Sequence, residues 1–519
     1  MDGRYIRFAE DSFQKWAKWH NGLSLGKKSG HFPLALLVVI LFIFLGNPPV
    51  SSELISPAMN TQMDIYSIGN HRQLFLDDWL VGKMDYVTRR LGTVTKHPDN
   101  PVLRREKPWE SARCELYGSA VWDGQNNRLQ MFYSAMSVPY DAKLAYAESP
   151  DAGTTWVKPG LDIHRIQGKP TNIVWPGRNY VAGPSVFIDT HDPNPNRRYK
   201  LFTCDYNAGT ERFPAVEGIY VAWSPDGIHW TGSPRNPVVP GLISDTAQCA
   251  FWDRDAKKYV AFVRLRVEGR RSVGMMESRN FENWTEPVVV YSPTQEDVAR
   301  DWQFYSLSVT PYEGLYVGLL WIFPATQASG NMNANSPVTW PELVVSRGGK
   351  EWRRVAYGEP FPPVGPAGQF DHRQIRTASS LVVLSDRLLL FYSASPDAHV
   401  REHHFDIGMA TLRRDGFACI EAGAAEGTLL TKPFRHTGGK LMINATAGPE
   451  GYVKAELFDK TGRPIKSYEA NHCREFKGDS LKGQITWKGK NTVPSTQEGV
   501  RIKFLLKNVK LYSFWIDPQ

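Results

Sequence analysis

Ser149 to Trp156 (SPDAGTTW) is the stretch on which the predicted fold depends. The Asp carboxylate can accept hydrogen bonds from its own turn and Gly tolerates a positive φ, so the run predicts a tight turn between strands. Related turns, each closing on an aromatic residue, recur at intervals of roughly 50 to 75 residues, a period typical of radial β repeats. They are Ser224 to Trp230 (SPDGIHW), Ser278 to Trp284 (SRNFENW), Ser346 to Trp352 (SRGGKEW) and the shorter Arg414 to Phe417 (RDGF). We expect each aromatic residue to pack between neighbouring sheets.

The composition is that of a globular β-rich protein. The 519 residues include 43 Gly, 36 Pro and 17 Trp. The net charge of +8 is spread thinly, without basic runs interleaved with aromatic residues, so nucleic acid is not an expected partner. The five Cys are odd in number and far apart, which argues against a disulfide framework and against a cysteine metal site.

Residues 1–52 are typical of a targeting segment. A basic leader precedes the apolar run from Phe32 to Leu45, which is short for a bilayer span and suits a signal peptide. The long basic leader favours an uncleaved signal anchor, and a buried core helix is the alternative that the charge asymmetry disfavours. We therefore expect an exported protein, periplasmic, secreted or held at the cell surface by residues 32–45 as a single-pass membrane tether. Residues 53–70 are predicted to be a linker.

Five units of similar pattern follow, each with a polar residue before a short apolar run, a turn and an aromatic-rich strand. The units open at Glu115, Gly183, Asp245, Asp301 and Asp371. This alternation predicts an all-β fold, a five-bladed β-propeller over residues 71–425. Residues 73–104 are expected to complete the last blade, and a sixth blade formed by them is the alternative. The alternating strands of residues 426–519 predict a separate β-sandwich.

The acidic residues that open these units are the candidate catalytic groups. The first strand of each propeller blade lines the central axis, so their side chains should converge in one funnel. Carboxylates crowded into one site cannot all ionise freely, which produces a general acid beside an ionised nucleophile or base, the requirement of glycoside hydrolysis. The candidates are Glu115, Asp245, Asp301 and Asp371, with Trp109, Tyr117, Gln248, Gln303, Tyr305, His372 and Arg373 as carbohydrate contacts. This chemistry needs no cofactor, and no metal is expected.

Each candidate also has a purely structural interpretation. An Asp that opens a strand often only accepts hydrogen bonds from turn amides. Arg373 and Arg376 could be ion partners of the same carboxylates. His399, His403 and His404 lie near acidic residues, but a solvated loop is favoured there over a metal site.

The run from Asn100 to Leu103 (NPVL) through the first unit resembles the five-bladed β-propeller glycoside hydrolases, the group that contains families 32, 43, 68 and 130. Family 32 has an Asn-Asp-Pro-Asn-Gly motif followed by an Asp-Gly turn. Cys114 to Gly118 (CELYG) takes that place here, and Asp123-Gly124 follows Glu115 at the family's spacing. The resemblance therefore places Glu115 at the position of the nucleophilic Asp. The other two motifs are matched by Ala182 to Pro184, without the Asp, and by Gln248-Cys249, with Asp245 as the nearest acid.

The sequence thus predicts an exported glycoside hydrolase acting on an extracellular oligo- or polysaccharide. Glu115 is assigned as nucleophile or base and Asp245 as general acid, while Asp301 and Asp371 tune pKa values or bind hydroxyl groups. Three alternatives stay open: a non-catalytic carbohydrate-binding propeller, a structural scaffold, and a glycoside phosphorylase. The phosphorylase would hold phosphate with Arg373, Arg376 or His372.

Overall fold

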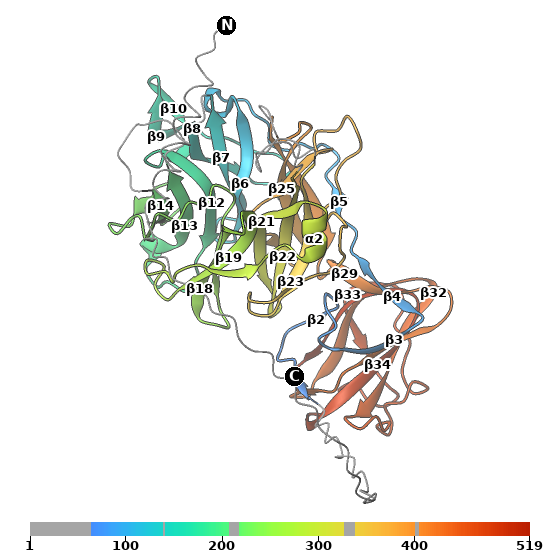
Figure 1. Ribbon diagram of the computed structural model, residues 1–519. Coiled ribbons are helices and arrows are strands. Elements are labelled where there is room, and N and C mark those ends of the chain that lie inside the picture. Colours follow the sequence, from blue (N-terminus) through green and yellow to red (C-terminus); the bar gives the residue numbers. More distant parts are fainter. Residues whose placement is uncertain (1–63, 139–140, 207–216, 326–337, 400–403, 519) are drawn as a thin grey trace, which may run out of the picture. The chain divides into compact units, whose positions relative to one another are not determined.

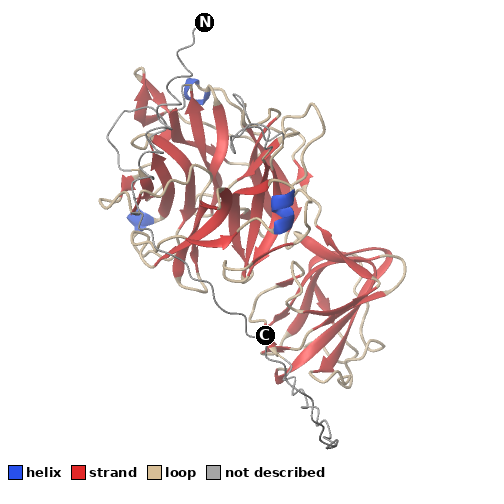
Figure 2. Ribbon diagram, viewed as in Figure 1, coloured by secondary structure: helices blue, strands red, loops and turns tan. Residues whose placement is uncertain are grey.

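The structure is a computed structural model. It describes residues 64–138, 141–206, 217–325, 338–399 and 404–518. Strands dominate this part of the chain, and its helices are few and short (Figure 2). The predicted signal or anchor at residues 32–45 lies outside the described residues. Within the described ranges, no helix is long and apolar enough to cross a membrane.

Five antiparallel sheets follow one another along the chain and form the five predicted blades (Figure 1). Blade one is β6 (Arg113–Asp123), β7 (Arg128–Ser137), β8 (Asp141–Ser149) and β11 (Ile173–Trp175). Blade two is β12 (Tyr180–Ile188), β13 (Tyr199–Tyr206), β14 (Gly218–Ser224), β15 (Thr231–Gly232) and β16 (Val239–Pro240). Blade three is β17 (Cys249–Asp253), β18 (Lys258–Val267), β19 (Arg270–Ser278) and β20 (Val288–Tyr291).

The last two blades have the same arrangement. Blade four is β21 (Trp302–Tyr312), β22 (Leu315–Pro324), β23 (Trp340–Ser346) and β24 (Trp352–Arg354). Blade five is β25 (Gln374–Thr377), β26 (Val382–Val383), β27 (Arg387–Ser395), β28 (Asp406–Arg413) and β5 (Thr95–Lys96). A hairpin and three short helices lie between these strands: β9 (Leu161–Ile166), β10 (Lys169–Thr171), η1 (Pro108–Glu110), η2 (Pro195–Arg197) and α2 (Gln295–Ala299).

Hydrogen bonds between the innermost segments of adjacent blades join the blades in a ring. Small side chains make most of these bonds, because the inner strands approach closely around the axis. The bonds are Val186 N to Ser119 Oγ (2.8 Å), Ala250 N to Ser185 Oγ (3.0 Å), Val309 N to Cys249 Sγ (3.3 Å), Leu381 N to Thr310 Oγ1 (2.9 Å) and Ser379 N to Gly118 O (2.8 Å). The first strands therefore line the centre, as predicted.

The recurring turns hold neighbouring blades together. In the first one, Ser149 Oγ accepts from Gly153 N and Asp151 Oδ1 accepts from Thr155 N, both at 2.9 Å. The closing aromatic ring of each turn packs edge-on against a ring of the preceding blade. The pairs and centroid distances are Trp156–Phe391 (5.6 Å), Trp230–Phe132 (6.2 Å), Trp284–Phe202 (5.0 Å), Trp352–Phe262 (5.6 Å) and Phe417–Tyr312 (5.3 Å). The predicted packing between sheets is confirmed, and the first pair joins the first blade to the last.

The segment expected to complete the last blade divides between two sheets. Thr95 and Lys96 pair with β28 and complete blade five, as predicted. Residues 73–91 instead pair with strands near the end of the chain, so that part of the expectation is wrong. Their partners lie hundreds of residues away, and no local pattern identifies them.

The remaining strands form a ten-stranded sheet from both ends of the described chain. They are β1 (Tyr66–Ser67), β2 (Gln73–Leu74), β3 (Val81–Asp85), β4 (Val87–Leu91), β29 (Ala418–Ala422), β30 (Gly427–Thr431), β31 (Phe434–His436), β32 (Lys440–Asp459), β33 (Asp479–Ile485) and β34 (Thr496–Asp517). The pairing joins all ten in one network, so the sandwich expected for residues 426–519 stays a prediction.

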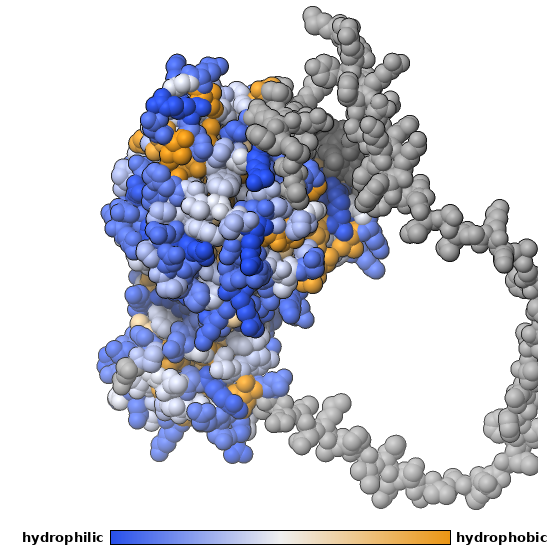
Figure 3. Space-filling model, turned by 90° about the vertical axis from the view of Figure 1, so that its left-hand side faces the viewer, coloured by the Kyte–Doolittle hydropathy of each residue, from blue (hydrophilic) through white to orange (hydrophobic). Residues whose placement is uncertain are grey.

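The exposed large apolar side chains of the described residues include Val288 and Val289, which are adjacent in the chain. The face in Figure 3 is mostly hydrophilic, with hydrophobic residues in separate groups. The five Cys are all buried and free.

Candidate active site

Blades one, three, four and five bring polar side chains together at the propeller centre. We call this group the hub cluster: Glu115 and Tyr117 of β6, Arg264 of β18, Arg271 of β19, Tyr305 of β21 and Arg376 of β25. All six side chains are buried. No local motif could assemble them, because they come from four blades.

Tyr305 is the centre of the hub cluster. The guanidinium carbons of Arg264, Arg271 and Arg376 lie 5.2, 5.3 and 5.3 Å from the centre of its ring. Burial opposes ionisation of the phenol, but the three positive charges and a hydrogen bond from Tyr117 lower the pKa of Tyr305 to about 8. Burial instead raises the pKa of Tyr117. The two phenols at the centre therefore differ in acidity, and Tyr305 can exchange a proton near neutral pH.

Glu115 is held between two arginines. It accepts a hydrogen bond from Nη1 of Arg376, and its Oε2 lies 3.3 Å from Nη1 of Arg113. Nε and Nη2 of Arg376 have no hydrogen-bond partner among the described residues, although both atoms are buried. Buried donors are normally paired. Arg376 thus has unused N–H groups next to Tyr305, and a ligand oxygen could accept hydrogen bonds from them.

Asp245 is the solvent-facing acid beside this group. Its carboxylate pairs with Arg264, and its side chain is 46% exposed whereas that of Arg264 is 7% exposed. Burial, followed by the nearby positive charge of Arg264, lowers the pKa of Arg271 to about 10, which leaves Arg271 protonated at neutral pH. The centre therefore holds buried cations next to a carboxylate that water can reach.

The other two predicted catalytic acids are placed differently. Asp371 pairs with Nζ of Lys96 at 2.6 Å and accepts from the Tyr392 hydroxyl at 3.0 Å, within blade five. Asp301 precedes β21 with a φ of 55°, and its carboxylate lies 3.9 Å from Nη1 of Arg270. The structure therefore links Glu115 and Asp245 to Tyr305 through arginines and gives Asp371 a separate ion pair.

Most predicted carbohydrate contacts have protein partners. Trp109 Nε1 donates to Asn172 at 2.8 Å, and the Gln248 side chain bonds to the Ser244 hydroxyl, also at 2.8 Å. Gln303 accepts from Nη1 of Arg271 at 3.0 Å and so supports the hub cluster. These contacts position neighbouring protein groups, and a direct role on a sugar stays a prediction.

The remaining predicted contacts fall into two kinds. Tyr117 and Tyr305 have rings 5.7 and 6.3 Å from that of Trp321, so protein groups cover part of their surface. Nε of Arg373 donates to Nε2 of His372 at 3.1 Å, and the other ring nitrogen of His372 lies 3.0 Å from the Gln369 carbonyl oxygen. Both residues are partly exposed and free of carboxylate partners in the described structure.

Arg264 and Arg271 were not predicted from the sequence as site residues. They flank a tight hairpin, Arg264 to Arg271 (RLRVEGRR), with Glu268 and Gly269 at its tip. Four arginines in so short a hairpin, two of them buried, were the available signal. Among the described residues, no group of three His, Cys, Asp or Glu side chains could hold a metal ion.

No protein-family model and no curated protein match the chain. Among solved structures, it is similar to the catalytic domain of a GH62 α-L-arabinofuranosidase from Coprinopsis cinerea, with 15% identity, a TM-score of 0.42 and coverage of 62% of this chain and 97% of that one. A β-1,2-mannobiose phosphorylase from Listeria innocua matches with 10% identity, a TM-score of 0.42 and the same coverage of both chains. At such values the similarity carries no information about the reaction of this chain. The five-bladed propeller is established by the chain's own strand pairing.

Proposed function

We propose that this protein hydrolyses a glycosidic bond of an extracellular oligo- or polysaccharide at the hub cluster, and that the sugar bound there carries a negative charge. The observation that carries the proposal is the set of arginines around Tyr305. Guanidinium groups bind carboxylates through paired hydrogen bonds, and this geometry suits a uronic acid.

The charge balance of the site supports an anionic ligand. Arg113 and Arg376 pair with Glu115, and Arg264 pairs with Asp245, so three guanidinium groups face two carboxylates. Burying cations in excess of their partners is costly unless a further anion compensates them. A sugar carboxylate next to the free donors of Arg376 would supply that charge.

The proposed reaction uses two groups. Asp245, paired with Arg264 and open to water, takes a proton from the attacking water as that water bonds to the anomeric carbon. Tyr305 gives its proton to the departing glycosidic oxygen, and its pKa of about 8 suits this role. Arg271 and Arg376 hold the sugar carboxylate, and Glu115 positions Arg376. The competing assignment is the one predicted from the sequence, with Glu115 as nucleophile or base and Asp245 as general acid.

Turnover of acidic oligosaccharides tests the proposal. We expect the wild type to release reducing ends from an oligouronate, and Asp245→Asn and Tyr305→Phe each to lower kcat by about 100-fold or more, the usual contribution of a general acid or base. Asp255→Asn, which changes an exposed carboxylate at the other end of blade three, is the matched control. Binding without turnover across acidic and neutral saccharides would instead identify a non-catalytic binding propeller.

Phosphorolysis is a second candidate, because phosphate would fit the free donors of Arg376 as a carboxylate does. Cleavage that requires inorganic phosphate and releases a sugar phosphate would select it. Cleavage at an unchanged rate in phosphate-free buffer would support hydrolysis.

Export is part of the proposal and rests on the apolar run from Phe32 to Leu45 after a basic leader. Fractionation of cells that express the full chain tests it. Recovery of the protein from the cytosol alone would contradict export.

A further inference from the structure

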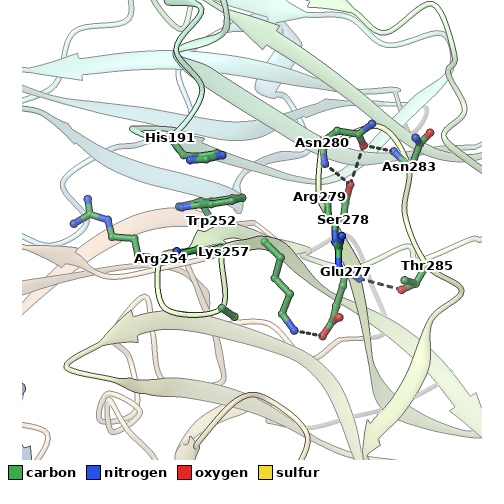
Figure 4. A pocket seen from close by; sticks show the side chains of 12 residues that line it. His191, Trp252, Arg254, Lys257, Glu277, Ser278, Arg279, Asn280, Asn283 and Thr285 are labelled. Carbon is green, nitrogen blue, oxygen red and sulfur yellow. Dashed lines mark hydrogen bonds and ion pairs between the residues drawn. The ribbon is translucent and has the colours of Figure 1, made fainter. Parts of the chain in front are cut away.

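A hollow of about 1300 Å³, formed by blades two and three, lies at the opposite ends of the blade-three strands from Arg264 and Arg271 (Figure 4). Its walls come from the turn between β17 and β18, the turn after β19 and the loop after β12. We propose that this hollow binds a stretch of acidic polysaccharide chain, independently of the reaction proposed for the hub cluster.

Cations outnumber acids among the residues that line the hollow. Arg254, Lys257, Lys258 and Arg279 line it together with the single acid Glu277. Lys258 Nζ and Glu277 Oε1 pair at 2.8 Å. The other three cations are exposed and have no ion-pair partner among the described residues. They can therefore meet the charges of an extended anionic chain.

Two further features fit a sugar chain. The His191 ring stacks on Trp252 with a centroid distance of 3.7 Å and an interplanar angle of 4°, so the two rings hold each other in place at one wall of the hollow. On the other side, the Asn280 side-chain oxygen accepts from Asn283 N at 2.9 Å, and the Asn283 side-chain oxygen accepts from Arg235 at 2.7 Å. These bonds orient both side-chain amides, whose NH₂ groups are suited to sugar hydroxyls.

The same features favour a polysaccharide over a nucleic acid. Single-stranded nucleic acid is usually held by bases stacked on open aromatic faces. Here His191 covers one face of Trp252, and the Tyr259 ring lies edge-on at 4.8 Å. The cations of the hollow match the carboxylates of a uronic-acid chain, and the side-chain amides of Asn280 and Asn283 match its hydroxyl groups.

Binding of defined oligosaccharides to the full chain tests the site. The probes are hexagalacturonate, a sulfated hexasaccharide, a neutral hexasaccharide and a single-stranded DNA hexamer, each measured by calorimetry at low and high salt. The variant is Arg254→Gln/Lys257→Gln/Arg279→Gln. The matched control, Lys482→Gln/Lys488→Gln/Lys490→Gln, removes the same charge from exposed positions near the chain's end. Arg271→Met reports any contribution of the hub cluster.

We expect hexagalacturonate to bind at the hollow equally in the wild type, the control and Arg271→Met, which removes only binding at the hub cluster. Binding to the hollow variant should be about tenfold or more weaker, and salt should weaken the binding at the hollow. Turnover of short substrates should be unchanged in the hollow variant. The sulfated probe determines whether carboxylate is required. Three results would each overturn the proposal. They are equal affinity of the hollow variant and the control, loss of binding in Arg271→Met alone, and stronger binding of DNA than of both acidic saccharides. Arg279→Gln alone, at an exposed position, provides a milder variant should the triple variant fold poorly.

Discussion

At the scale of single residues, the most informative group is Tyr305. Its pKa is lowered from 10.0 to about 8, so the phenol is protonated below this pH and ionised above it. If Tyr305 donates the proton to the leaving group, kcat should fall as the pH rises through about 8. A pH–rate profile of the wild type measures this. An activity that instead rises through the same range would indicate that the phenolate is the base or nucleophile.

Glu115 provides a second prediction, because it compensates a buried arginine. Glu115→Gln leaves Arg376 without its carboxylate, and breaking a buried ion pair costs about 3–5 kcal/mol. We expect this loss in the free energy of unfolding, measured with denaturant. The double variant Glu115→Gln/Arg376→Met should recover much of it, because the fully buried charge is gone and only Arg113, whose side chain is 16% exposed, lacks its carboxylate. Full stability in the single variant would show that the pair is not needed to hold Arg376.

At the scale of elements, the turns join one blade to the next. Gly153 has a φ of 96°, and a Cβ there would lie 2.8 Å from the Phe391 ring of blade five. Gly168 has a φ of 77° with nothing within 4 Å of such a Cβ, so it is a matched control for backbone strain alone. We expect Gly153→Ala to lower the free energy of unfolding by about 1–3 kcal/mol more than Gly168→Ala does, since this is the usual cost of overpacking. The thermal midpoints of the two variants, which should differ in the same direction, check this. Equal losses would mean that the contact between blades one and five is readily adjusted.

The elements also show what the sequence could predict. Turns such as Ser149 to Trp156 are local, so their repeat predicted five blades and the packing of Trp156 between sheets. The acids Glu115 and Asp245 were predicted because they precede or open inner strands. Arg264 and Arg271 were missed because strand alternation alone does not say which arginine of a hairpin turns inward. Their burial follows from packing against Tyr305, which only the folded chain brings near.

At the scale of the whole molecule, distant segments meet at Asp415. Its carboxylate accepts from Arg72 at 2.7 Å, Ser513 at 2.6 Å, Tyr312 at 2.5 Å and Asn444 at 3.1 Å. No sequence pattern relates these segments, which is why the pairing of residues 73–91 with the end of the chain was not predicted.

Asp415→Asn should therefore destabilise the protein as a whole. Burial opposes the charge, but Arg72 and the hydrogen bonds lower the pKa of Asp415 below its usual 3.8. The stabilisation is thus present above pH 3.8 and lost as the pH falls through the lowered pKa. We expect the variant to lose about 3 kcal/mol or more at neutral pH, as in other broken buried pairs. Unfolding curves at pH 7 and near pH 3 check this. An equal difference in the free energy of unfolding between wild type and variant at both pH values would contradict it.

The selectivity of the hub cluster tests the central claim most directly. The measurement is the ratio of kcat/KM for an oligouronate to that for the neutral oligosaccharide of equal length and linkage, in the wild type and in Arg271→Met. We predict a wild-type ratio of about 100 or more, from charge-assisted hydrogen bonds of about 1.5–3 kcal/mol each, and a ratio about tenfold or more lower in the variant, in which Arg376 still binds the carboxylate. A wild-type enzyme that cleaves both substrates equally well, or a variant that keeps the full preference, would contradict the account.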